Sequence, residues 1–393
     1  MSRIAYLVSA GLLLLGCQTT QVPTNAPLPE DARGMPVYNG GYALLPMLQE
    51  PRGAILFAMA FSGGGKRSAA FAHGVLRGLR QIPVVEDGRT RSLLDEADYI
   101  AAVSGGSFPA MHYGLYGDKS FETFPDDFLK QDINAYIYGT FLLPWNWEWL
   151  VNPFYGTNDR MAEIYDRLMF HGATYADLER RGLPLIAVNA TDIAYGISFS
   201  FTQPYFDLLC SDLSSFPVAR AVAASNGFPV LFSPTRRVLV LSVDGQSAAD
   251  PSLPKQRVVT GLGQIFGAVS GTQIDAYNFE TLILTDGELR RLVEKIRTAR
   301  CAQSRVIAGH DCADVRGALV HISLAGIPDP ELRQRLQAIP TGLTIADAEV
   351  EALIAAGEQL VQQNAKIREL ISGLDSGAAV AKAAPAPRSR ARR

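Results

Sequence analysis

One short segment of the 393-residue chain has the residues and spacing of an activated serine, Ala102-Val103-Ser104-Gly105-Gly106. A serine hydroxyl attacks an acyl carbon when a base removes its proton and a sharp strand-to-helix turn exposes its Oγ. That turn needs small residues two positions before and after the serine, here Ala102 and Gly106. Ala102 replaces the usual first glycine, and Gly105 adds backbone freedom. The segment therefore predicts Ser104 as a nucleophile on an elbow.

A second segment, Ser62 to Arg67, places three consecutive glycines before two cations. The N–H groups of Gly63, Gly64 and Gly65 at the start of a helix would form a positive cradle. In an ester hydrolase this cradle would be the oxyanion hole, which binds the negative oxygen of the tetrahedral intermediate. Arg67 would either pin this loop and add positive potential, or lie on the helix surface.

The patterns of apolar residues predict how these segments are positioned. A helix follows the glycines, because Phe71, Val75 and Leu79 recur every four residues, and a second helix begins near Pro109. Glu351 to Leu370 predicts a long surface helix. Alternation of strands and helices predicts an α/β fold, with a central, mostly parallel sheet and helices on both faces. Strands are expected at Ala54 to Phe61, Tyr99 to Val103, Leu183 to Thr191, Phe199 to Phe201, Arg237 to Val243 and Leu319 to Leu324.

Three motifs in this order resemble the patatin-like phospholipase family. They are the glycine segment with its helix (SGGGKRSAAFAHGVLRGL), the elbow (IAAVSGGSFPA) and the stretch ARAVAASNGFPVLFSP, Ala219 to Pro234. The resemblance covers roughly Ala54 to Thr285 and departs from the family at Ser68, where glycine is frequent. It implies a patatin-like three-layer sandwich that cleaves lipid acyl esters through an acyl-serine intermediate. It also implies a Ser–Asp dyad, with no histidine and no cofactor.

The base implied by this resemblance is an aspartate in an Asp-Gly-Gly or Asp-Gly-Ala motif beyond that stretch. Asp244 precedes Gly245 at the end of a predicted strand, but Gln246 follows, and we take Asp244 as the candidate base. Asp286, which precedes Gly287, is expected to cap a helix. The strand before Asp244 also looks like a later family strand. On that interpretation the catalytic segment is absent, and the protein is a catalytically impaired lipid-binding lipoprotein.

The five histidines lack a motif that would make a Ser-His-Asp triad. His73 and His112 are expected to pack on the two helices that follow the glycine-containing segments. His171 lies in a turn, His310 in a loop and His321 in a strand.

The first residues predict export and lipidation. Arg3 precedes an apolar run, Ile4 to Leu15, that is too short to span a bilayer comfortably. The run ends at Gly16-Cys17, which resembles the lipobox of bacterial lipoproteins, where the cysteine is lipidated and begins the mature chain. An ordinary secretory signal is the alternative. Gln18 after Cys17 favours, by resemblance to Gram-negative sorting, the outer membrane and the periplasmic side.

These features divide the chain into a signal peptide (1–17), a tether (18–50), a patatin-like domain (51–330), a C-terminal helical segment (331–377) and a disordered basic tail (378–393). Phe141 to Phe154 contains all three tryptophans, Trp145, Trp147 and Trp149. Alternating aromatic residues suit either a membrane-docking lid or a packed cluster on the body.

Net charge and motif content limit which classes of molecule the protein is expected to bind. The net charge is −3 although five cations and no acids lie in the last sixteen residues, so the body is acidic and nucleic acid is disfavoured as a partner. A nucleotide-binding loop is a distant third alternative, because Ala60 and Arg67 stand where that motif needs Gly and Ser or Thr. The expected partner is membrane lipid.

The cysteines and histidines are not spaced as metal ligands, so no metal site is expected. Export makes a disulfide feasible. Cys301 and Cys312 are the likelier pair, which leaves Cys210 as a buried free thiol.

Overall fold

The computed structural model describes residues 25–31, 34–38, 40–44, 55–86, 88–136, 157–192, 197–225, 237–245, 262–307, 310–340 and 342–372. The predicted signal peptide with Cys17, the tryptophan segment and the basic tail lie outside these residues. So do parts of the tether and the second half of the stretch Ala219 to Pro234.

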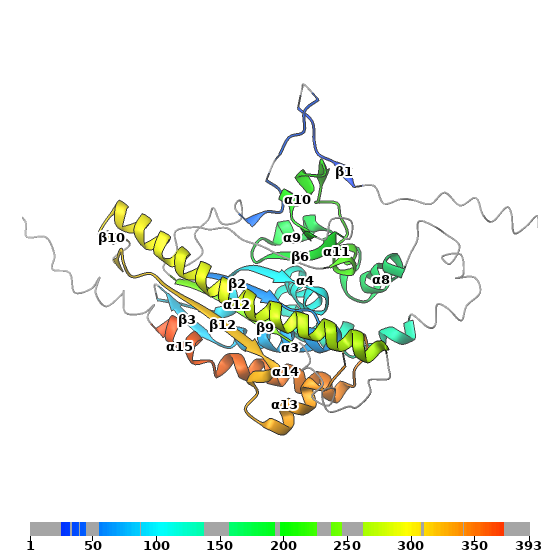
Figure 1. The fold of residues 1–393 in the computed structure, drawn as a ribbon. Coiled ribbons are helices and arrows are strands. Elements are labelled where there is room, and N and C mark those ends of the chain that lie inside the picture. Colours follow the sequence, from blue (N-terminus) through cyan, green and yellow to red (C-terminus); the bar gives the residue numbers. More distant parts are fainter. Residues whose placement is uncertain are drawn as a thin grey trace, which may run out of the picture.

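A six-stranded sheet forms the centre of the molecule (Figure 1). All neighbouring strands are parallel except β6 and β7, which run antiparallel. The predicted strands are confirmed to within a few residues, and the expected α/β architecture with a mostly parallel sheet is correct. The strands lie in the order β12 (Arg316–Ser323), β9 (Arg237–Asp244), β2 (Ile55–Phe61), β5 (Ala97–Ala102), β6 (Leu185–Asp192) and β7 (Ile197–Ser200).

One face of the sheet is covered by α3 (Gly65–Arg80), on which α14 (Asp347–Gln362) packs. Two glycines bring these helices into backbone contact. A Cβ on Gly74 would lie 2.0 Å from the carbonyl oxygen of Ile354, and a Cβ on Gly357 would lie 2.4 Å from that of Phe71. The predicted long C-terminal helix is in fact two helices, since α14 ends before Gln363 and α15 spans Ala365–Ser372. The side of α14 that packs on α3 is buried, so this helix belongs to the core as well as to the surface.

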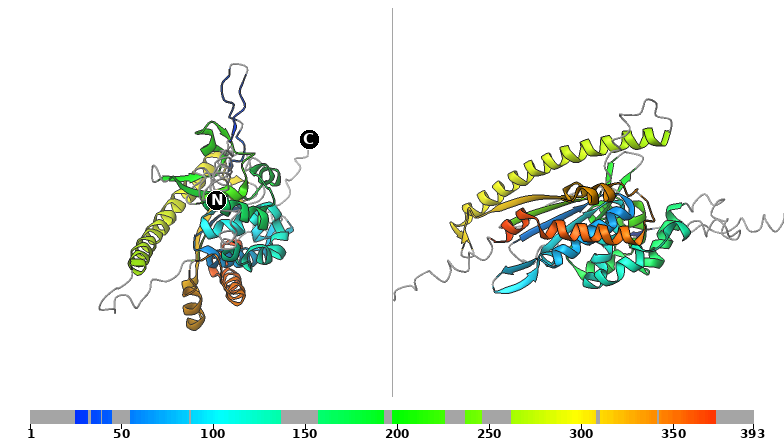
Figure 2. Two further views of the ribbon diagram at one scale, coloured as in Figure 1. Left: turned by 90° about the vertical axis from the view of Figure 1, so that its right-hand side faces the viewer. Right: turned by 90° about the horizontal axis from the view of Figure 1, so that it is seen from below.

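The other face of β9 and β12 packs against the long helix α12 (Leu262–Gln303). Val240 and Leu319 contact the cluster formed by Leu289, Leu292 and Ile296. Their strand neighbours Leu241 and Val320 point into the main core instead, because successive side chains alternate across a strand. The sheet therefore lies between α12 and α14, as the right-hand view of Figure 2 shows.

The remaining elements surround this sheet. The helices are η2 (Leu93–Glu96), η3 (Ser104–Gly106), α4 (Ser107–Tyr116), η4 (Gly117–Lys119), α5 (Ser120–Phe124), η5 (Pro125–Leu129), α8 (Thr157–Tyr165), η7 (Asp166–Phe170), α9 (Tyr175–Arg181), α10 (Gln203–Asp207), α11 (Val218–Ala224), η9 (Leu324–Gly326) and α13 (Pro330–Gln337). The short strand pairs are β1 (Ala26–Pro27) with β8 (Ser211–Asp212), β3 (Pro83–Glu86) with β4 (Arg89–Ser92), and β10 (Val306–Ile307) with β11 (His310–Asp311).

Two sequence predictions are wrong here. Asp286 does not cap a helix, because it lies inside α12, where it pairs with Arg290. Cys210 is exposed rather than buried, because it lies in a surface turn after α10. The Cys301–Cys312 disulfide is present as expected. Among the described residues, no helix is long and apolar enough to cross a bilayer.

Candidate active site

Ser104 lies on a strained elbow between β5 and α4. Its φ angle is 47°, a left-handed conformation that L-residues other than Asn and Asp seldom adopt. The chain reverses here because Gly106 approaches β2 closely: a Cβ at Gly106 would lie 2.7 Å from the Cβ of Phe61. Strain of this kind persists only where surrounding contacts enforce it, and it is concentrated at functional sites. Ala102 ends β5 just before this turn.

The glycine loop between β2 and α3 lies directly against this elbow. A Cβ on Gly63 would approach the Cβ of Ser104 to 3.3 Å and its Oγ to 3.8 Å. A Cβ on Gly105 would lie 2.1 Å from the carbonyl oxygen of Gly65, so no larger residue fits between the two loops. Gly64 and Gly65 have φ angles of 134° and 61°, which favour glycine.

The N–H groups of Gly63, Gly64 and Gly105 form no hydrogen bond to any residue in the described part of the chain. Backbone donors beside a helix N-terminus are suited to hold an anion. A side chain on Gly63 would meet that of Ser104, so the glycine loop lies beside the Ser104 hydroxyl.

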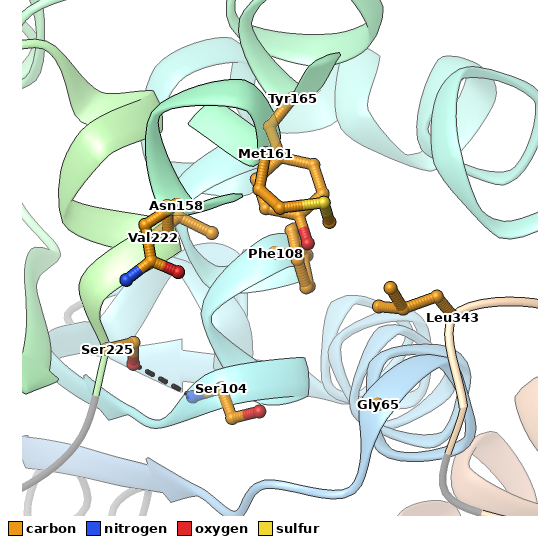
Figure 3. A pocket seen from close by; sticks show the side chains of 10 residues that line it. Gly65, Ser104, Phe108, Asn158, Met161, Tyr165, Val222, Ser225 and Leu343 are labelled. Carbon is orange, nitrogen blue, oxygen red and sulfur yellow. Dashed lines mark hydrogen bonds between the residues drawn. The ribbon is translucent and has the colours of Figure 1, made fainter. Parts of the chain in front are cut away.

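Ser104 opens into a cavity of about 150 Å³ (Figure 3). A cavity of about this volume is large enough for a molecule the size of benzene. Its surface is polar and apolar in nearly equal parts. The cavity is lined by Gly65, by the apolar side chains of Phe108, Met161, Val222, Ala223 and Leu343, and by the polar side chains of Ser104, Asn158, Tyr165 and Ser225.

Asp244 is placed at the end of β9, on the far side of β2 from Ser104. Its carboxylate accepts a hydrogen bond of 3.2 Å from the hydroxyl of Ser62, the first residue of the glycine loop. The Ser62 Oγ in turn accepts a bond of 3.0 Å from the N–H of Gly245. The Ser104 hydroxyl itself bonds to no residue that the structure describes. Asp244 is therefore coupled to the glycine loop through Ser62, and not directly to Ser104.

Arg67 is a buried anchor of the glycine loop rather than a surface residue or an oxyanion donor. Only 1% of its surface is exposed. Its Nε donates to the carbonyl oxygen of Gly245 at 2.7 Å, and its Nη1 donates to that of Ile339. Burial lowers the pKa of Arg67, and the negative charge of Asp244 partly offsets this effect. Of the two roles predicted for Arg67, pinning the loop is the one that the contacts support.

Residues 59–248 match the model of the patatin-like phospholipase family. The chain carries a patatin-like phospholipase domain. The family name describes lipid acyl hydrolases, and the match includes the glycine loop, the elbow and Asp244. No curated protein sequence matches the chain.

Among solved structures, the patatin-like chain is similar to human GIVD cytosolic phospholipase A2 in complex with methyl gamma-linolenyl fluorophosphonate, at 16% identity and a TM-score of 0.43. The same enzyme with this inhibitor and terbium chloride matches at 15% identity and a TM-score of 0.43. The first match covers 86% of this chain and the second 85%, and this chain spans 62% of the length of each.

Two serines that the sequence analysis did not single out hold the elbow of the patatin-like domain. The Ser104 N–H donates to Ser225 Oγ at 2.8 Å, and Ser107 Oγ lies 3.0 Å from the same atom. Ser225 belongs to the family-like stretch Ala219 to Pro234. The sequence therefore marked the stretch that contains Ser225. It did not show that Ser225 bonds to Ser104, which lies 121 positions away.

The buried position of Lys66 was also missed, because a lysine beside a glycine loop usually faces solvent or binds a phosphate. It is fully buried, and its Nζ donates to the carbonyl oxygens of Leu129 (3.0 Å) and Gln131 and lies over the Phe128 ring. Burial lowers the pKa of Lys66 to about 8. Lys66 thus joins the start of α3 to the end of η5.

The histidines of the patatin-like domain do not line the cavity. His73 and His112 are buried on α3 and α4, as expected, and burial lowers their pKa values to about 3 and about 4. His321 in β12 lies 3.2 Å from Ser242 Oγ. Within the described residues, no group of three or more His, Cys, Asp or Glu side chains is arranged to bind a metal ion.

Proposed function

We propose that this protein is a serine acyl hydrolase that cleaves fatty acyl esters of lipids, with Ser104 as the nucleophile. The observation that carries the proposal is the position of Ser104. It has a strained φ of 47°, lies beside Gly63 and opens into a cavity lined in part by apolar side chains. Acyl transfer to a serine uses an exposed nucleophile with backbone donors beside it, and a lipid substrate adds an acyl chain that apolar side chains can contact.

The proposed reaction has two halves. Ser104 Oγ attacks the ester carbonyl carbon while its proton passes to a base, and the N–H groups of Gly63 and Gly64 hold the developing oxyanion. The intermediate collapses, the C–O bond breaks, and the alcohol leaves with that proton. Water then attacks the acyl-Ser104 ester, and its proton passes through the base to Ser104 as the fatty acid departs.

Asp244 is our candidate for the base. It is the carboxylate coupled to the glycine loop, through the Ser62 hydroxyl at 3.2 Å. This contact places Asp244 next to the residue that precedes Gly63 in the glycine loop, and proton transfer would require its carboxylate to reach Ser104 in the substrate complex.

A second function is favoured by a different observation. Since the Ser104 hydroxyl has no hydrogen bond to a carboxylate among the described residues, the same cavity would also suit lipid binding without hydrolysis. This alternative matches the degraded motif after Asp244, in which Gln246 stands where the family has Gly or Ala.

Labelling with a fluorophosphonate, which reacts with activated serines, separates the two functions. We expect the purified full-length protein to be labelled and Ser104→Ala to remain unlabelled. Ser215→Ala, at an exposed serine on the loop before α11, is the matched control and should be labelled like the wild type. An unlabelled wild-type protein that still binds lipid would establish the binding function instead.

A further inference from the structure

A narrow arm projects from the body beside α10 (Figures 1 and 2). The arm, made of the described residues between 25 and 44, is joined to the α10 turn by the β1–β8 pair. The Leu28 N–H also donates to the carbonyl oxygen of Cys210 at 3.2 Å. Farther out, Asp31 N–H donates to Met35 at 2.9 Å and Val37 N–H donates to Pro29 at 2.7 Å, so the arm folds back on itself.

The base of the arm is fixed to the sheet by Tyr42. This side chain is buried, and its hydroxyl accepts a bond of 2.7 Å from the N–H of Ile186 and donates to the carbonyl oxygen of the same residue. The carbonyl oxygen of Tyr42 accepts a bond of 2.9 Å from Gln203, the first residue of α10. The arm and α10 are thus held together and to the body.

The outer part of this structure exposes large apolar side chains. Leu208 is 81% exposed and Leu209 is 54% exposed, in the turn between α10 and β8, and Met35 and Tyr38 on the arm are each 61% exposed. Val37 is 40% exposed. We name Met35, Val37, Tyr38, Leu208 and Leu209 the apolar tip. The backbone bonds of Leu28 with Cys210 and of Val37 with Pro29 join the two segments that carry these residues. Scattered apolar residues are ordinary on a surface, whereas a set carried by adjoining segments is typical of an interaction site.

We propose that the apolar tip inserts into the surface of the lipid bilayer that holds the substrate. This proposal rests on the proposed function, since a lipid hydrolase must reach its substrate in a membrane. The predicted lipid anchor indicates that the partner of the apolar tip is a bilayer. Cys17, where the sequence predicts a lipid anchor, precedes Ala26 of β1 by nine residues. Such a segment spans at most about 30 Å, so the anchor would hold β1 and the neighbouring tip near the bilayer.

Charge around the apolar tip indicates the kind of lipid surface. Glu30 and Asp31 lie on the arm, and Asp207 and Asp212 flank the turn that bears Leu208 and Leu209. These acids would be repelled by anionic headgroups, so we expect insertion by apolar contact into zwitterionic bilayers, and little dependence on salt.

The exposed free thiol of Cys210 adjoins the apolar tip and allows a direct test. The full-length protein is labelled there with an environment-sensitive fluorophore and mixed with phosphatidylcholine vesicles. Cys301 and Cys312 are joined in a disulfide, and Cys210→Ser, labelled in parallel, measures the signal from any other thiol. We expect a blue shift that lipids carrying a nitroxide quench, and the same response in Ser104→Ala. The docking result therefore does not depend on catalysis.

Leu208→Asp/Leu209→Asp should abolish the blue shift, because losing two apolar contacts lowers the inserted population by about 100-fold. Ile283→Asp/Leu284→Asp on α12 is the matched control, since these residues are similarly apolar and exposed, and it should respond like the wild type. If the protein sediments with the vesicles but the emission of the Cys210 fluorophore is unchanged, the proposal is wrong. A blue shift without vesicles that grows with protein concentration would also overturn it, in favour of a second copy of the chain.

Discussion

The amide nitrogen of Ser104 and the hydroxyl oxygen of Ser225 are joined by a hydrogen bond of 2.8 Å. Because this bond uses the N–H of Ser104, the donors of the proposed oxyanion hole would be those of the glycine loop and of Gly105. The bond also fixes the elbow from α11, an element distant in the chain from both loops.

Removal of this bond should impair catalysis more than substrate binding. We expect Ser225→Ala to lower kcat by about 100-fold, since a misplacement of about 1 Å costs that much, with a small change in KM. Ser225→Thr keeps the hydroxyl and should restore most of the rate. Hydrolysis of a soluble p-nitrophenyl ester measures both constants, and a Ser225→Ala enzyme with wild-type kcat would contradict the positioning role.

The close approach of the two glycine-containing loops predicts a steric effect at Gly105. Gly105→Ala would place a Cβ 2.1 Å from the carbonyl oxygen of Gly65, so we expect loss of fluorophosphonate labelling and a lower melting temperature. Gly287→Ala on α12 is the control, because no atom lies within 4 Å of its added Cβ. The free energy of unfolding of this control should rise by about 0.5–1 kcal/mol, because alanine favours the helix over glycine by that amount. Unchanged labelling of Gly105→Ala would show that the loops separate readily.

The bond between Ser62 and Asp244 predicts that both residues affect the chemical step. If Asp244 is the base, Asp244→Asn should lower kcat by about 100-fold or more. Ser62→Ala should lower it less, because the carboxylate remains. Thermal unfolding of both variants provides the control for a purely structural role. Wild-type kcat in Asp244→Asn would exclude Asp244 as the base.

The burial of His73 predicts a dependence of stability on pH. Its pKa is lowered to about 3 in the folded state, while in the unfolded chain it is about 6.5. Between these values the unfolded state binds a proton that the folded state does not. The free energy of unfolding therefore falls as pH decreases from about 6.5 toward 3, by up to about 1.4 kcal/mol per pH unit.

His73→Leu should remove this part of the pH dependence. Both ring nitrogens of His73 lack a hydrogen-bond partner among the described residues, so the variant should be as stable as the wild type or more stable at pH 7. Urea unfolding at pH 5 and pH 7 measures the difference. If the free energy of unfolding depends on pH equally in both proteins, the assignment to His73 is wrong. His321→Leu on β12 is the comparison variant at another histidine.

The elbow and the glycine loop could be predicted because each motif is local, with Ser104 or Gly63 to Gly65 between one strand and one helix. The partners of these loops could not be predicted, because Ser225, Gly245 and Ile339 come from distant segments that only the fold brings together. Asp286 was misassigned for a different reason. Asp is a favoured N-cap residue and Gly is unfavourable inside a helix, but here α12 continues through both.

The contact of Gly74 with Ile354 has a consequence for how the protein can be dissected. The helix that begins at the glycine loop shares a backbone interface with α14, which lies beyond the segment matched by the family model. Gly342, just ahead of α14, accepts a hydrogen bond of 3.0 Å from the N–H of Lys66. A fragment that ends before Gly342 would therefore expose the back of α3 and remove a partner of the glycine loop. The smallest fragment that keeps these contacts must extend through α14.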